Sequence, residues 1–189
     1  MKKTLWPLLV LAVLLTACVP SLHPLYTADT LVFREELIGI WKEDPQDEDS
    51  WTFTKRDDAK SYALVIREKQ LSSSFEARLV KLGDHLFLDL VADGDSLNEK
   101  VGDLYKASLI PGHLVMKLKL GAKFELQMLE PSKINELLKA SPKEIARTFL
   151  QEDYLVLTAS TADLQAFFKK HADSKDLWGE PGVMQKLVL

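Results

Sequence analysis

The stretch that decides the fold is "HLVMKLKLGAKFELQM", residues 113–128, in which apolar and polar side chains alternate. Apolar residues occupy every second position in its first half, and the pattern returns in its second half after Gly121 and Ala122. A period of two places the apolar side chains on one face of each strand, which is typical of half-buried antiparallel strands. A glycine-containing pair between two such runs favours a tight turn. The stretch therefore predicts a β-hairpin with one face in a core.

The same alternation recurs along the chain from residue 37 onward. Short segments rich in turn-forming residues separate the apolar runs. We expect strands at 37–43, 50–56, 61–68, 74–82, 85–91, 105–110, 113–120 and 123–129. Consecutive strands with short connections predict an antiparallel up-and-down sheet, and closure into a barrel removes its exposed edges. The fold is thus expected to be mainly β (α+β), with a barrel of about eight or nine strands followed by C-terminal helices.

The apolar period changes after residue 129. Ser132 is expected to cap a short helix, and residues 141–144 ("SPKE") match a capping box with proline at the first helical position. One more strand is expected at 154–160. Ser160 then begins a helix whose apolar stripe should lie against the barrel wall or across one mouth. The stripe consists of Leu164, Phe167, Phe168 and His171.

The N-terminal residues, "MKKTLWPLLVLAVLLTAC", have two lysines followed by an apolar run from Leu5 to Ala17 broken only by Thr16. This run of 13 residues is shorter than the roughly 20 that a membrane-spanning helix needs. A positive start, a short apolar middle and small residues at the end are typical of a secretory signal peptide. We therefore expect export from the cytoplasm.

Residues 15–18, Leu-Thr-Ala-Cys, resemble the lipobox of bacterial lipoproteins, and Cys18 is the chain's single cysteine. The resemblance implies that a lipid is attached to the Cys18 sulfur and that a signal peptidase cuts between Ala17 and Cys18. Two or three acyl chains would form a firm membrane anchor. By analogy with sorting in bacteria with two membranes, Val19 and Pro20 favour the periplasmic face of the outer membrane over the inner membrane.

The sequence predicts four segments. They are a signal peptide at 1–17, a lipid-anchored tether at 18–34, the barrel domain with its C-terminal helices at 35–175, and an irregular tail at 176–189. The tether is not very polar, so the alternative is that Leu25, Tyr26, Leu31 and Phe33 pack back onto the domain.

The first strand of the barrel contains Gly39-Ile40-Trp41, which resembles the G-x-W motif of lipocalins. This resemblance implies a calycin-type barrel whose base is closed by Trp41 and whose interior holds a small apolar ligand. Without a ligand, Gly39 would permit close packing and Trp41 would be a core residue. The segments "IPGH" (110–113) and "LTASTADLQAFFKKH" (157–171) are similar to segments of uncharacterised bacterial lipoproteins.

The inward-facing positions of the expected strands carry bulky side chains. An eight-stranded barrel is either filled by such side chains or just wide enough for one small ligand. The residues that would fill the interior or line a ligand site are Trp51, Phe53, Tyr62, Phe75, Phe124 and Met128.

Other functions are disfavoured by the sequence. The chain has a formal net charge of −4 and lacks the clustered Lys and Arg of nucleic-acid-binding proteins. The histidines do not have metal-ligand spacing, and the acidic segments 43–49 and 93–99 do not match a calcium loop. The chain also contains none of the common catalytic motifs. We therefore expect no catalytic residues, no metal and no cofactor.

Two functions remain after these exclusions. The first is a non-catalytic envelope lipoprotein that holds a small apolar ligand in its barrel, as the fold resemblance implies. The alternative is a structural or interaction lipoprotein with a filled barrel, which docks other envelope proteins through an outer surface or its tail, with the helix at 161–172 needed for docking. The bulky interior favours this alternative.

Overall fold

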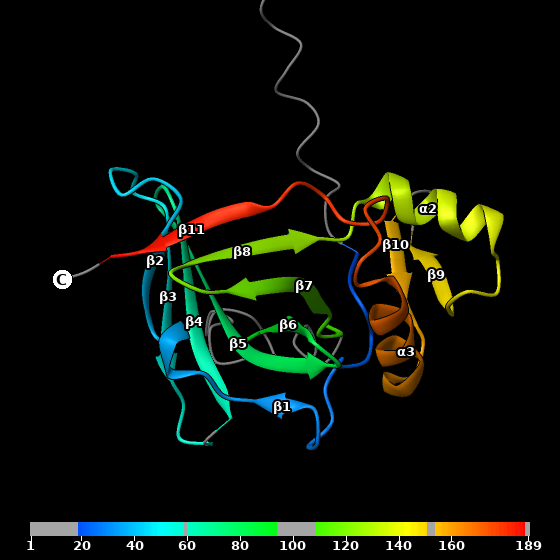
Figure 1. The fold of residues 1–189 in the computed structure, drawn as a ribbon, viewed down its shortest axis with the longest axis horizontal. Helices are drawn as coiled ribbons and strands as arrows, with labels where there is room; N and C mark the ends of the chain where they lie inside the picture. The colour runs from blue at the N-terminus through cyan, green and yellow to red at the C-terminus, as the bar shows by residue number, and fades with distance from the viewer. Residues whose placement is uncertain (1–18, 59, 94–108, 151–153, 188–189) are drawn as a thin grey trace, which may run out of the picture.

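The computed structural model describes residues 19–58, 60–93, 109–150 and 154–187. Its centre is a closed antiparallel barrel of lipocalin-like architecture, with β1 (Leu31–Val32) as an additional strand (Figure 1). The expected fold class is confirmed. The eight barrel strands are β2 (Gly39–Lys42), β3 (Ser50–Lys55), β4 (Ser61–Glu68), β5 (Leu71–Leu82), β6 (His85–Ala92), β7 (His113–Leu120), β8 (Lys123–Met128) and β11 (Gly182–Lys186).

The predicted hairpin at 113–128 is confirmed as β7 and β8. Its register pairs Met116 with Met128, Leu118 with Leu126, and Leu120 with Phe124. Paired residues lie on the same face of a sheet, so the two apolar rows of the hairpin face the barrel interior together. The lysines between them point to the outside of the wall.

The strand that closes the barrel is β11, within the segment that we expected to be an irregular tail at 176–189. It pairs antiparallel with β8, where Met184 lies opposite Phe124, and with β2, where Gln185 lies opposite Lys42. Met184 points inward and is 5% exposed, whereas Val183 points outward and is 42% exposed. The prediction of an irregular tail is therefore wrong at 182–186. This short segment forms a strand because β2 and β8 each present an unpaired edge, and the segment pairs with both.

The strand expected at 105–110 cannot be compared in full, since residues 94–108 lie outside the described part of the chain. Leu109 and Ile110 are described and are not in a strand. In the barrel, β6 pairs directly with β7.

The prediction of a helix beginning at Ser141 is also wrong. α2 (Pro131–Ala140) ends before it, and residues 141–146 form turns that lead into β9 (Arg147–Leu150). The Glu144 carboxylate cannot complete a capping box because it accepts hydrogen bonds from Lys170 and His171, which lower its pKa. The expected Ser132 cap is displaced too, since Glu130 holds the N-cap position and Pro131 begins the helix.

The helix predicted after Ser160 is confirmed as α3 (Thr161–His171), with the Asp163 amide donating to the Ser160 hydroxyl. α2, β9, β10 (Tyr154–Leu157) and α3 gather on one side of the barrel (Figure 1). The apolar stripe of α3 is buried against the outer face of the wall, where the Phe168 ring meets the Phe87 ring at 5.7 Å.

Residues 19–34 are packed onto the domain, in contrast to the tether expected at 18–34. Val19 is 8% exposed and Leu25 is fully buried. Ser21 bridges two elements, because its backbone pairs with His113 at the start of β7 and with Leu157 in β10. The Leu25 amide donates to the buried Asp89 carboxylate at 2.7 Å. The segment folds back because its apolar side chains and backbone groups find partners there.

A substitution in β11 tests its role as a barrel strand. We expect Met184→Ala to lower the free energy of unfolding by about 2–5 kcal/mol, because a cavity would replace an inward methionine. Val183→Thr is the matched control on the outer face, and we expect it to change stability by less than about 0.5 kcal/mol. Urea unfolding followed by circular dichroism measures both. Equally small effects in the two variants would contradict the assignment.

Candidate functional site

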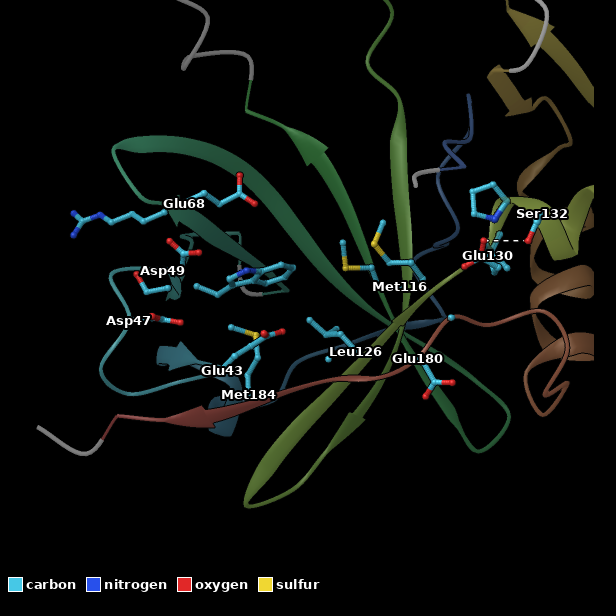
Figure 2. Close-up of a pocket in the computed structure, with 18 residues that line it drawn as sticks. Glu43, Asp47, Asp49, Glu68, Met116, Leu126, Glu130, Ser132, Glu180 and Met184 are labelled. Carbon is cyan, nitrogen blue, oxygen red and sulfur yellow. Dashed lines mark hydrogen bonds between the residues drawn. The ribbon is translucent and has the colours of Figure 1, made fainter. Parts of the chain in front are cut away.

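The two ends of the barrel differ. One end, which we call the mouth, carries the connection between β2 and β3 and the turn between β4 and β5. Here the wall encloses a cavity of about 910 Å³. A cavity of this size is within the range of small-molecule sites in proteins. Figure 2 shows the side chains that line it.

The floor of the mouth is apolar. Inward residues of four strands form it, and in Figure 2 Met116 and Leu126 lie near its centre, with Met184 to one side. Methionine side chains are flexible and polarizable, so a floor of this kind adapts to apolar ligands of different shapes. The floor residues are Trp51, Met116, Leu126, Met128 and Met184.

The rim of the mouth is acidic. In Figure 2 the carboxylates form two groups, one near the β2–β3 connection and one near the start of α2 and the segment before β11, with Met116 and Leu126 between them. The first group is Glu43, Asp47, Asp49 and Glu68, and the second is Glu130 and Glu180. Arg67 is the one cationic side chain that lines the cavity in the described part of the chain.

Hydrogen bonds fix parts of this rim. Asp49 Oδ1 accepts from the backbone amide of Lys69 at 2.7 Å, which joins the β2–β3 connection to the β4–β5 turn. Glu130 Oε1 accepts from the Ser132 hydroxyl at 3.2 Å. Glu43 lies over the start of β11, where a Cβ on Gly182 would be 3.0 Å from its Oε1 atom, so the glycine makes room for this carboxylate.

The opposite end, the base, is closed by the N-terminal segment and by Trp41. Trp41 is 2% exposed, its indole Nε1 donates to the Leu37 carbonyl at 2.8 Å, and its ring lies 4.4 Å from the Phe124 ring. Lys186 of β11 places its ammonium 5.4 Å from the centre of the Trp41 ring. Trp41, which the G-x-W resemblance placed at the base, is thus a buried residue of the packed interior.

The bulky residues expected in the interior divide into three groups. Trp51 and Met128 line the mouth. Phe53, Tyr62 and Phe124 are fully buried in the packed interior, where Tyr62 also stacks on Phe33 at 4.8 Å. Burial raises the pKa of the Tyr62 phenol, which donates to the Arg34 carbonyl. Phe75 is half-buried against the same packed cluster and does not line the cavity. The barrel is therefore filled toward its base and open at its mouth.

The two residues expected at the lipid site, Ala17 and Cys18, lie outside the described residues, so the structure gives no contacts for them.

The sequence did not predict that the rim residues lie close together. Segment 43–49 was visible as an acidic loop, but Glu68, Glu130 and Glu180 come from three other connections and no local pattern joins them. Met184 was missed because it lies in the segment expected to be irregular.

The described ranges contain neither a metal-binding cluster nor a membrane-spanning helix. No group of three or more His, Cys, Asp or Glu side chains there is placed to hold a metal ion. None of the helices in those ranges has both the length and the apolar character needed to cross a bilayer.

Comparison of the chain with family models, with curated proteins and with solved structures gave no significant match.

The base of the barrel yields a prediction about Gly39. Its φ of +134° is unfavourable for other residues, and a Cβ there would be 2.6 Å from Lys186 Cε. We expect Gly39→Ala to lower the free energy of unfolding by about 1–3 kcal/mol. Adding Lys186→Ala should restore part of this loss, since it removes the steric clash but leaves the backbone strain. Urea unfolding of the two single variants and the double variant measures the coupling. An unchanged stability of Gly39→Ala would contradict the described geometry.

Proposed function

We propose that this protein is a non-catalytic bacterial cell-envelope lipoprotein, anchored through lipid on Cys18, that binds one small apolar molecule in the mouth of its barrel. The observation that carries the proposal is the cavity of about 910 Å³ with an apolar floor. The floor side chains are apolar and can bury the apolar surface of a ligand. The polar and charged side chains lie at the rim of the cavity. Small-molecule sites in proteins have this arrangement.

The position of the N-terminal segment supports an anchored domain. Val19 is the first described residue and is already buried, and the backbone of Ser21 is paired on both sides. A lipid on Cys18 would therefore hold the domain directly at the membrane surface, without a long flexible linker. The proposed location is the periplasmic face of the outer membrane, because Val19 and Pro20 follow the cysteine in the sorting analogy described above.

The lipid anchor can be tested by mass. Intact-mass measurement on protein extracted from membranes of the native bacterium should show loss of residues 1–17 and the added mass of acyl chains on Cys18. Cys18→Ser should abolish both changes, because the modified sulfur is missing. Recovery of the wild-type chain with its initiator methionine and a free thiol would refute the anchor.

The ligand site can be tested by binding of decanol, a simple apolar probe, measured by calorimetry. We expect Trp51→Ala to weaken binding by about tenfold or more, since a large apolar contact is lost from the floor. Leu71→Ala is the control, because Leu71 is 72% exposed at the start of β5 and does not line the cavity. Native mass spectrometry of the purified protein should also detect a copurified small molecule. Trp51→Ala binding decanol as tightly as the wild-type protein would contradict this site.

One observation favours the second candidate, docking of another envelope protein. Phe149, Leu150 and Tyr154 are each about half exposed at one end of the β9–β10 pair. The helix first considered for docking is less suitable, because the apolar stripe of α3 is buried against the barrel.

A further inference from the structure

The mouth of the barrel combines an apolar floor with an acidic rim, and this combination restricts the chemistry of its ligand. We propose that the ligand is an amphipathic organic cation, with an extended apolar body on the floor and an ammonium-type group at the rim. This inference depends on the proposed binding function and adds the charge of the ligand to it.

The first observation is that the described part of the rim carries more carboxylates than cations. Among the described residues, six carboxylates and one guanidinium line the cavity. None of the six forms a salt bridge with a described residue, whereas Asp58, Glu76 and Glu144 elsewhere on the domain do. A concave surface with one sign of charge and low-dielectric walls concentrates ions of the opposite sign. The mouth therefore attracts cations and repels anions.

The second observation is that the polar side chains around the cavity can accept hydrogen bonds from a ligand N–H group. Ser50 lines the same cavity as the rim carboxylates. Its hydroxyl oxygen accepts hydrogen bonds, as carboxylate oxygens do. An ammonium group supplies such donors.

The third observation concerns the floor. A small metal ion or a fully polar cation would leave Trp51, Met116 and Met128 in contact with water and would gain nothing from them. An alkyl chain buries against these residues and contributes roughly 0.8 kcal/mol for each CH₂ removed from water. Rim and floor therefore select the two parts of one amphipathic molecule.

Three probes with the same chain and different headgroups test the charge. They are decylamine, which is cationic at neutral pH, decanol, which is neutral, and decanoate, which is anionic. We expect decylamine to bind the wild-type protein at least about tenfold more tightly than decanol at low salt, a ratio that corresponds to about 1.4 kcal/mol. Decanoate should bind most weakly. Raising the salt to about 0.5 M should bring the ratio toward one through screening.

Charge-matched variants locate the effect. Replacing Glu43, Glu68 and Glu180 by glutamine should reduce the preference for decylamine over decanol to less than about threefold. The control replaces Glu35, Glu36 and Glu136 by glutamine, since these exposed residues remove the same total charge but do not line the cavity. The control should keep the full preference. Melting curves of both triple variants verify that they are folded.

Each outcome separates the two proposals. If decanol and decylamine bind equally, or decanoate binds most tightly, the charge inference is overturned and apolar binding stands. If the control variant loses the preference as much as the rim variant, only the net charge of the protein matters and the inference also fails. If none of the three probes binds, the proposed binding function itself is wrong.

Discussion

The pairing of β11 with β2 on one edge and with β8 on the other is the constraint on which the remaining structure depends. Without this strand, two neighbouring edges of the sheet would expose unpaired backbone groups, which is a liability for any β protein. The pairing also carries Met184 into the interior and Lys186 onto the Trp41 ring. One five-residue strand therefore closes the wall and completes the packing at the base.

Closure gives the two ends of the barrel different properties. Toward the base, Trp41, Phe53, Tyr62 and Phe124 fill the interior, so no ligand can pass through. At the mouth the inward side chains are mostly methionine and leucine, and the strand connections spread around a cavity. The interior is thus packed with side chains toward the base and hollow at the mouth.

The N-terminal segment links the barrel to the helical side of the molecule. Ser21 pairs with both β7 and β10, and the buried Asp89 carboxylate joins the Leu25 amide to the His113 ring, where Oδ1 and Nδ1 are 2.7 Å apart. Asp89 lies on the outer side of the wall, so its burial depends on this covering segment. The covering segment, the small β9–β10 sheet and α3 form a second core outside the barrel.

The sequence by itself determined the barrel strands in which apolar and polar residues alternate, the hairpin at 113–128 and the Ser160 cap. It could do so because strand period and helix capping depend on residues that are close together in the chain. It also placed Trp51, Phe53 and Met128 on inward faces. Only the tertiary structure decided that residues 182–186 form a strand, that 19–34 pack onto the domain, and that Glu43, Glu68, Glu130 and Glu180 share one rim. These features depend on pairing and proximity between residues far apart in the chain, such as Lys42 and Gln185, and no local periodicity records such contacts.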